Sequence, residues 1–284
     1  MTDPHAAPRI HSDAGTVAFI GGGNMARSLI GGLVGRGGDP SRLRVAEPVE
    51  ALRQGLAGDF GVQVFDGAAQ AAEGADLWLL AVKPQVLRQV CESLRGIAGR
   101  ERPLVVSIAA GITSAQLQRW LGHPLPVVRA MPNTPALLGA GVTGLFAGPQ
   151  VDGDGRQRAE ALLSSAGATV WVDDEALIDA VTAVSGSGPA YAFLLAEAME
   201  SAGIAQGLSP EAARTLVGQT LLGAARMLTE GDEPPAELRR RVTSPGGTTQ
   251  AAIETFQAGG FEALVGSAIA AAAERGRQLS AAND

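Results

Sequence analysis

Two glycines and an alanine lie where a strand pattern changes to a helix pattern near the start of the chain. Residues 16–20 are β-prone, and Gly21, Gly23 and Ala26 follow them at the spacing G-x-G-x-x-A. At this spacing the first glycine permits a tight turn, the second lets a pyrophosphate approach the backbone, and the alanine allows close helix–strand packing. The helix that follows directs free N–H groups and the positive end of its dipole toward the phosphates. The motif therefore predicts a dinucleotide site.

Three further loops follow later strand patterns. Lys83 is the single lysine of the chain and directly follows an apolar run, residues 107–111 are small, and Asn133 lies in a loop stiffened by prolines. Ligands of open α/β sheets bind outside the carboxyl ends of the strands, so we expect these loops to line the same crevice. The alternative for each loop taken alone is ordinary packing.

Glu47 follows the second strand pattern, 21 residues after Ala26. A carboxylate at about this distance binds the 2′-hydroxyl of an NAD ribose, which favours NADH. Arg44 and Arg53 are close in sequence and offer a 2′-phosphate an alternative partner. The other interpretation of Glu47 is a solvated loop residue.

Two segments farther along the chain combine glycines and hydroxyl side chains with a helix pattern. They are residues 184–191 and residues 242–249. Free backbone N–H groups at a helix N-terminus bind carboxylates and phosphates, so the pair predicts a small anionic substrate. The alternative is a glycine turn that only starts a helix.

The order of the elements predicts an α/β fold in two parts. Strand and helix patterns alternate up to residue 173, which is typical of a doubly wound sheet. Beyond it only helices are expected, so we predict a dinucleotide-binding domain over 1–173 and an all-helical domain over 174–284. The expected strands are 17–20, 44–46, 62–65, 77–82, 104–108, 127–130, 142–145 and 169–172. The expected helices of the second domain are 175–184, 189–202, 210–229, 236–242, 248–257 and 261–280.

The expected helix over 189–202 is apolar on nearly all sides. A helix without a polar face must be covered all round, and the helical part of the chain is small. We therefore expect a second subunit to cover it, the alternative being the central helix of a compact bundle.

Composition narrows the chemistry. A net charge of −7 argues against nucleic-acid and anionic membrane partners, and a single cysteine, Cys91, fits a reducing cytoplasm. The histidines, His5, His11 and His123, lie outside the loops above, and no metal-ligand spacing is present. The predicted site thus lacks a base for alcohol oxidation, and a cyclic imine that is already protonated in water suits it better.

Six motifs together resemble the pyrroline-5-carboxylate reductases, the last enzymes of proline synthesis. They lie at residues 19–25, 81–84, 107–111, 131–135, 185–191 and 244–249, and the resemblance runs from Thr16 onward. It implies a Rossmann-type domain followed by an all-helical dimerisation domain, in a homodimer that extends to larger rings such as a decamer of five dimers. It also implies reduction of 1-pyrroline-5-carboxylate to L-proline by a reduced nicotinamide dinucleotide.

The resemblance also implies roles for particular residues. The turn over 244–249, supplied by the neighbouring subunit, would bind the substrate carboxylate through the Ser244 hydroxyl and the Gly247 and Thr248 amides. Thr249 would be the catalytic residue that hydrogen-bonds the ring nitrogen. The implied substrate-binding residues are Ser244, Gly246, Gly247, Thr248 and Thr249. The implied cofactor-binding residues are Gly21, Gly23, Asn24, Met25, Ala46, Glu47, Ala81, Lys83, Ala110 and Asn133.

Cofactor choice is where the sequence departs from the family. Many relatives that use NADPH have Ser or Asn at the position of Glu47, so the resemblance favours NADPH while Glu47 keeps NADH open. Two other functions stay as alternatives. A β-hydroxyacid dehydrogenase would need a lysine in the helical domain, where this chain has none. A nucleotide-sensing module would have no use for paired anion turns.

Overall fold

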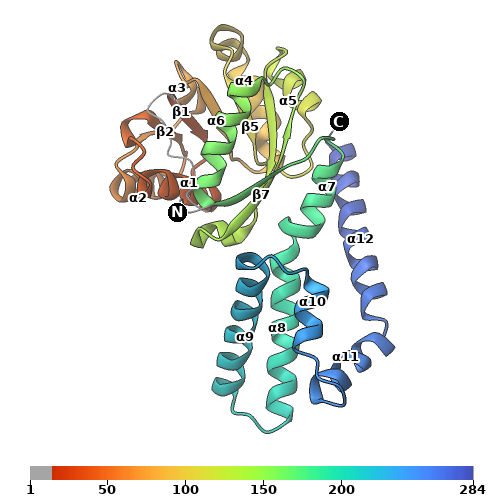
Figure 1. The fold of residues 1–284 in the computed structure, drawn as a ribbon. Coiled ribbons are helices and arrows are strands. Elements are labelled where there is room, and N and C mark those ends of the chain that lie inside the picture. The colour runs from red at the N-terminus through yellow and green to blue at the C-terminus, as the bar shows by residue number, and fades with distance from the viewer. Residues whose placement is uncertain (1–14, 284) are drawn as a thin grey trace. The chain divides into compact units, whose positions relative to one another are not determined.

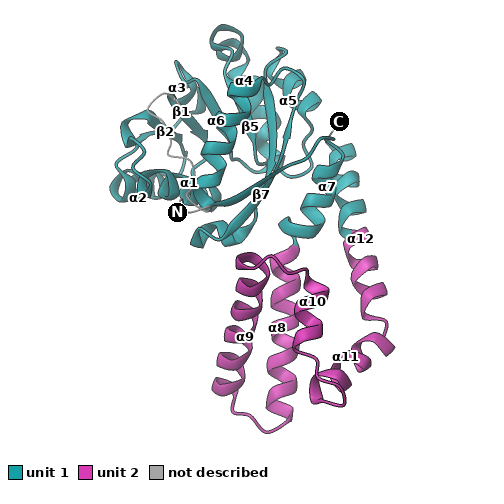
Figure 2. Ribbon diagram, viewed as in Figure 1, with its two compact units in different colours: residues 1–187, 272–284 teal, residues 188–271 magenta. Residues whose placement is uncertain are grey.

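The computed structural model describes residues 15–283, which form two compact units (Figures 1 and 2). Unit 1 contains the chain up to Ser187 together with the residues from Ala272 onward, and unit 2 is Gly188–Ala271. The fold is thus an α/β unit followed by helices, as predicted. The domain boundary at residue 173 stays a prediction, because the last strand ends at Trp171 while compactness divides the chain at Ser187.

Unit 1 is built on an eight-stranded sheet in the order β3-β2-β1-β4-β5-β6-β7-β8. All eight predicted strands are present, each within a few residues of its expected bounds. They are β1 Val17–Ile20, β2 Leu43–Ala46, β3 Gln63–Phe65, β4 Leu77–Leu80, β5 Leu104–Ser107, β6 Val127–Met131, β7 Gly141–Ala147 and β8 Gly167–Trp171. Pairing is parallel throughout except between β6 and β7, which run antiparallel. The order reverses beside β1, which places the expected ligand crevice at the carboxyl ends of β1 and β4.

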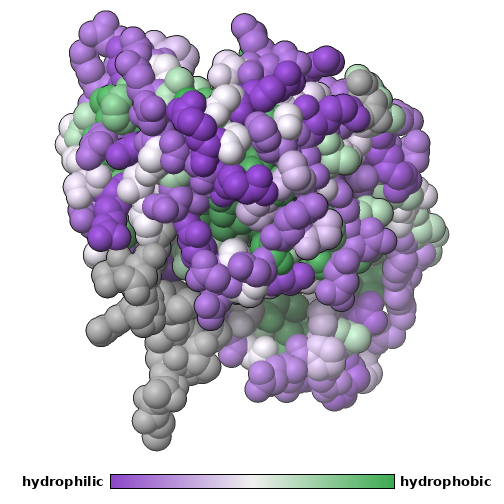
Figure 3. Space-filling view, turned by 90° about the horizontal axis from the view of Figure 1, so that it is seen from above, coloured by the Kyte–Doolittle hydropathy of each residue, from purple (hydrophilic) through white to green (hydrophobic). Residues whose placement is uncertain are grey.

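Helices cover both faces of this sheet, and the central strands are therefore apolar on both faces. Alternate residues of β4 point to opposite sides: Leu77 and Leu79 join one core cluster, Trp78 and Leu80 the other. The first cluster includes residues of α1 and α6, and the second those of α4 and α5. The helices are α1 Asn24–Gly35, α2 Glu50–Phe60, α3 Ala68–Ala72, α4 Pro84–Glu101, α5 Ser114–Leu121 and α6 Gly153–Leu163. The face of the molecule in Figure 3 is mostly hydrophilic, with small apolar areas between polar side chains.

After β8 the described chain is helical. The helices are α7 Leu177–Val181, a π-helical turn Thr182–Gly186, α8 Gly188–Ala205, α9 Pro210–Glu230, α10 Pro235–Arg241, α11 Thr248–Ala258 and α12 Phe261–Ala282. Short 3-10 turns at Pro40–Arg42, Thr134–Leu138 and Ser164–Ala166 complete the elements. Prolines occupy the first turns of α9 and α10, where a missing N–H costs nothing. Helix α12 begins in unit 2 and ends in unit 1.

One expected break between helices is absent. The sequence predicts separate helices over 175–184 and 189–202, but the backbone stays right-handed helical through Thr182 and Ser187. The hydroxyls of Thr182 and Ser185 donate to carbonyls four residues back, and the Ser187 N–H bonds the Thr182 carbonyl at 2.8 Å. The glycines and serines that the sequence pattern indicated as a helix end thus lie within a continuous helical backbone.

Candidate active site

The turn between β1 and α1 has the geometry that an anion needs. Gly21 has φ +110°, and a Cβ there would lie 2.8 Å from the Ala81 carbonyl oxygen. A Cβ at Gly23 would meet nothing within 4 Å, so the space in front of this residue is open. Helix α1 begins with no side chain capping it and no acidic residue in its first turn. Its first N–H groups and its positive dipole end are therefore available to a pyrophosphate.

Close packing behind the turn depends on Ala26. This residue is 1% exposed and belongs to the core cluster between α1 and the sheet. Gly22 is equally confined, because a Cβ there would approach Leu56 Cδ1 to 2.7 Å and Glu47 Cβ to 3.0 Å. The turn is therefore fixed from behind and open only toward the predicted ligand. The residues of the turn fit a dinucleotide.

The Glu47 side chain folds under this turn. It is 7% exposed, its Oε2 accepts from the Gly22 N–H at 3.0 Å, and its Oε1 accepts from the Val49 N–H at 2.9 Å. Glu47 is therefore no solvated loop residue. A carboxylate has about four acceptor positions, so acceptor capacity remains for a ribose hydroxyl.

The two arginines near Glu47 have different partners. Arg53 Nη1 donates to the carbonyls of Glu47 and Pro48, at 2.8 and 3.2 Å, which holds its guanidinium at the turn after β2. Arg44 instead donates to the Glu73 carbonyl at the end of α3. Of the two, only Arg53 is held where it could meet a 2′-phosphate.

The carboxyl ends of β4, β5 and β6 bring the other predicted cofactor residues to the same edge of the sheet. We call this edge, which carries Ala81, Lys83, Ala110 and Asn133, the cofactor edge. Lys83 directly precedes α4 and is exposed, and within residues 15–283 its ammonium has no hydrogen bond or ion pair. Ala110 is half-buried in the loop after β5. The Ala81 N–H bonds the Ile20 carbonyl at 2.8 Å, which joins the end of β4 to the glycine turn.

Asn133 ties the loop after β6 to its surroundings. Its Oδ1 accepts from the Val142 N–H at 3.0 Å, and its Nδ2 donates to the Ser185 carbonyl at 3.2 Å. The side chain is 8% exposed. The amide thus connects β7 and the π-helical turn to the cofactor edge, a role that the sequence did not indicate.

The turn over residues 244–249 lies in unit 2 and is exposed. Gly246 has φ +70°, and its N–H bonds Gln250 Oε1 at 2.7 Å. The Gly247 N–H bonds the Ser244 carbonyl at 3.0 Å, closing the turn. Gly247 therefore differs from the donor role that the resemblance implies, because its N–H is already used. The Thr248 amide lies at an α11 N-terminus without a side-chain cap, and its donor role stays a prediction.

The prediction of a second anion-binding turn, over residues 184–191, is wrong. Because the helix continues through the π-helical turn, this segment does not present a helix N-terminus. Its position is still informative, since π-helical turns are frequent at functional sites and Asn133 contacts this one directly.

Other reactive groups are absent or inert among the described residues. Cys91 is fully buried in α4, and burial raises the pKa of its thiol to about 12. No group of three or more His, Cys, Asp or Glu in the described part of the chain could hold a metal ion. His5 and His11 lie outside the described residues. Between residues 15 and 283, no single helix is long and apolar enough to cross a membrane. Only α11 and α12 taken together, bent by 54°, reach that length and composition.

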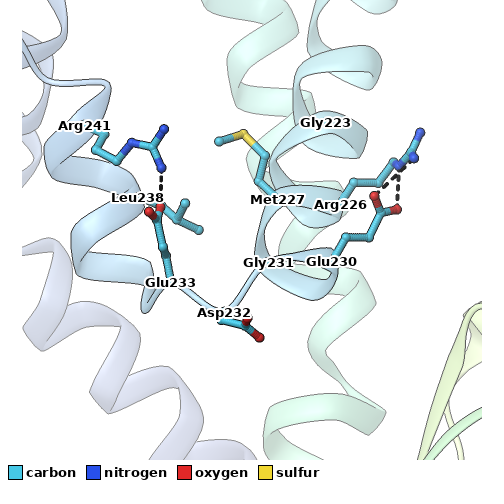
Figure 4. Close-up of a pocket in the computed structure, with 9 residues that line it drawn as sticks. All are labelled: Gly223, Arg226, Met227, Glu230, Gly231, Asp232, Glu233, Leu238 and Arg241. Atoms are coloured by element: carbon cyan, nitrogen blue, oxygen red, sulfur yellow. Dashed lines mark hydrogen bonds and ion pairs between the residues drawn. The ribbon is translucent and has the colours of Figure 1, made fainter. Parts of the chain in front are cut away.

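A hollow of about 780 Å³ lies elsewhere, between the end of α9 and α10 (Figure 4). Four of its charged side chains form two ion pairs: Arg241 pairs with Glu233, and Arg226 pairs with Glu230 at 2.7 Å. None of the predicted site residues lines it. The candidate site therefore does not include this hollow.

Sequence reasoning missed an ion pair between the buried Arg129 and the half-buried Glu175. Glu175 accepts from the Ser114 N–H and hydroxyl, both at 2.7 Å, and from Arg129 Nη1 at 3.0 Å. It thereby joins the chain just before α7 to the start of α5 and to β6. The available signal was Arg129 itself, a charge within an otherwise apolar strand that must find a partner when buried.

Comparison with known proteins bears on both units. Residues 175–279 match the family described as pyrroline-5-carboxylate reductase dimerisation, and residues 16–111 match the family described as NADP oxidoreductase coenzyme F420-dependent. A pyrroline-5-carboxylate reductase of Pseudomonas aeruginosa is 54% identical over 264 residues, which is 93% of this chain and 96% of that protein. One from Vibrio alginolyticus is 42% identical over 93% of this chain and 97% of its own length.

Solved structures agree with these relatives. The structure of a pyrroline-5-carboxylate reductase from Coxiella burnetii has a TM-score of 0.91 and 42% identity, covering 94% of this chain and 99% of that one. A pyrroline carboxylate reductase from Plasmodium falciparum, solved with NADP bound, has a TM-score of 0.81 and 26% identity, covering 94% and 98%. The resemblance deduced from the six motifs is confirmed, and the chain belongs to the pyrroline-5-carboxylate reductase family.

Proposed function

We propose that this chain reduces 1-pyrroline-5-carboxylate to L-proline with a reduced nicotinamide dinucleotide, the last step of proline biosynthesis. The observation that carries the proposal is the family match, which spans nearly the whole chain and so includes both the glycine turn and the helical part. The open, uncapped start of α1 and the loops at the same sheet edge support it.

The chain's own residues bind and orient in this reaction. The bound dinucleotide supplies the hydride. Gly23 and the first amides of α1 hold its pyrophosphate, and the loops with Ala81, Lys83, Ala110 and Asn133 frame its nicotinamide end. The imine nitrogen is protonated in water, so the substrate carbon accepts the hydride without an acid from the enzyme. Catalysis then depends on positioning and electrostatics.

The exposed turn over residues 244–249 supplies the substrate side in our proposal. The α11 N-terminus and the Ser244 hydroxyl bind the substrate carboxylate, and Thr249 hydrogen-bonds the ring nitrogen and aims the imine carbon at the nicotinamide. We propose that this turn comes from the neighbouring subunit.

A homodimer follows from the same proposal. Helix α8 has no buried residue in the single chain, and Phe193 and Leu194 are 68% and 67% exposed. Leaving such side chains in water forfeits the free energy of burying them, so a second copy is the cover that fits. The match to a dimerisation family over 175–279 supports this. Assembly of five such dimers into a decamer is the larger form that we propose.

For the cofactor, we propose that both NADPH and NADH are used and that Glu47 shifts the balance toward NADH. The NADP-bound relative and the wider family support NADPH. The buried Glu47 carboxylate opposes a 2′-phosphate, while Arg53, held at the same turn, attracts one. The two side chains therefore act in opposite directions on the same group.

The experiment that tests the function is a turnover assay with purified protein. The imine and either reduced cofactor are mixed with the protein, and the loss of reduced-nicotinamide absorbance is followed. We expect turnover with at least one cofactor. No turnover with either, from protein that binds the cofactor, would reject the proposal and favour a nucleotide-sensing module.

A further inference from the structure

The last turn of α12 packs on the loop between β5 and α5. This loop contains Ala110, which the proposed function places beside the cofactor, and α5 begins at Ser114. Both the loop and the end of α12 belong to unit 1. The contact joins residues about 170 positions apart and is made by polar side chains of both partners.

Asn283 bonds the loop backbone directly. It directly follows the end of α12, and its Nδ2 donates to the Gly111 carbonyl at 3.2 Å and to the Leu279 carbonyl of that helix at 2.8 Å. The Asn283 amide therefore bridges the helix end and the residue after Ala110.

Gln116 forms a second connection from the α5 side. Its side chain is 1% exposed, its Oε1 accepts from the Thr113 N–H at 2.8 Å, and its Nε2 donates to the Ser280 carbonyl at 3.0 Å. The same amide thus caps α5 and bonds a carbonyl near the end of α12. The start of α5 and the end of α12 are fixed together.

Gly111 allows the approach. It has φ +70°, and a Cβ there would lie 3.1 Å from Leu279 Cβ. Farther back, a Cβ at the buried Gly276 would lie 3.0 Å from Asp179 Oδ1 of α7. Small residues therefore let the last turns of α12 lie directly on unit 1.

We propose that the last turn of α12 positions the Ala110 loop for the cofactor, with Asn283 as the positioning residue. This inference rests on the proposed function only in placing the cofactor at Ala110. Asn283 acts through the Gly111 carbonyl: holding that peptide fixes the backbone next to Ala110. Without the bond the loop must be ordered when the cofactor binds, which weakens binding but leaves the chemical step unchanged.

The test uses Asn283→Asp and Asn283→Ala in the full chain. Both remove the amide donor, the first at constant size and the second without adding charge. The control is Gln278→Glu, the same amide-to-carboxylate change five residues earlier within α12, where the amide bonds Glu274 and Arg275. The readouts are the Kd of the reduced cofactor from its fluorescence, the KM values of cofactor and imine, kcat, and Tm.

We expect the cofactor Kd and KM to rise about fivefold in both Asn283 variants, the effect of one neutral hydrogen bond. The imine KM, kcat and Tm should stay as in the unchanged chain, and Gln278→Glu should match it throughout. An unchanged cofactor Kd in both variants would overturn the inference, as would a fall of kcat and Tm together with a rise of the imine KM. Because the Kd needs no turnover, it tests Asn283 even if imine reduction fails.

Discussion

Glu47 is the residue at which sequence and family point to different cofactors. From the sequence we predicted that Glu47 binds the ribose of NAD. In the structure its carboxylate accepts hydrogen bonds from two backbone N–H groups beneath the glycine turn. A buried carboxylate fixed in this way cannot swing aside for a 2′-phosphate without losing both bonds. In our proposal, the opposite charges of Glu47 and Arg53 therefore set the cofactor preference of this chain.

Replacing Glu47 with Ser removes the carboxylate that is proposed to oppose a 2′-phosphate. We expect Glu47→Ser to raise kcat/KM for NADPH relative to NADH by about tenfold to a hundredfold, because the like charge beside the 2′-phosphate is gone. Steady-state kinetics with both cofactors measure the ratio. Arg44→Ala, whose arginine bonds the Glu73 carbonyl, is the control and should leave the ratio unchanged. A ratio that stays constant in Glu47→Ser would contradict the assigned role.

Thr249 has the most specific role proposed for a side chain here. Thr249→Val removes the hydroxyl at nearly constant size, and we expect kcat/KM for the imine to fall about a hundredfold while the cofactor Kd is unchanged. Thr255→Val, six residues farther along α11 at an exposed hydroxyl, should behave as the unchanged chain. Loss of cofactor binding with intact turnover would be the opposite result and would remove Thr249 from the site.

Among the elements, strands and their order of appearance were predictable and some connections were not. Short segments of three to six residues between amphipathic stretches identified all eight strands. Several of them are near-continuous apolar runs, the pattern that strands covered on both faces leave. The antiparallel direction of β7 was not predictable, since direction depends on where the chain returns and not on side-chain pattern. The π-helical turn and the contact of α12 with Gly111 were missed because both depend on tertiary partners.

The candidate site, like the fold, could be predicted only in part from the sequence. Glycine spacing and strand ends identified the residues at the cofactor edge, because tight turns and close backbone approaches require particular residue types. The hydrogen bonds of these residues could not be predicted from the sequence. The side-chain amide of Asn133 bonds Ser185 and Val142, and the backbone N–H of Gly247 bonds the Ser244 carbonyl.

Helix α1 offers a test of its close packing. In Gly32→Ala the new Cβ would lie 2.1 Å from the Ser165 carbonyl oxygen, so we expect the free energy of unfolding to fall by about 2 kcal/mol. Gly35→Ala in the same helix meets nothing within 4 Å and should raise it by about 0.5 kcal/mol. Denaturant unfolding of the two variants measures both values. Equal stability of the pair would show that α1 does not lie against the Ser164–Ala166 turn.

On the scale of the whole molecule, the single chain is incomplete in unit 2. Its described helices expose large apolar side chains, while the sheet of unit 1 buries most of its own. In our proposal a second copy covers α8 and also supplies the turn over residues 244–249.

A charge on α8 should therefore disrupt both assembly and activity. We expect Phe193→Glu to shift the protein toward monomer in sedimentation experiments and to lower turnover at least tenfold, because burying an unpaired charge at an interface is costly. Ser93→Glu, an exposed position on α4 of unit 1, should change neither. An unchanged protein that sediments as a monomer and is fully active would contradict the dimer proposal.

The central claim is the reduction of an imine to proline, and its most direct measurement is the product itself. Purified protein is incubated with 1-pyrroline-5-carboxylate and a reduced nicotinamide cofactor, and L-proline and oxidised cofactor are quantified together. Our account predicts one L-proline for each cofactor oxidised. Cofactor oxidation without proline, or no oxidation by protein that binds the cofactor, would contradict it.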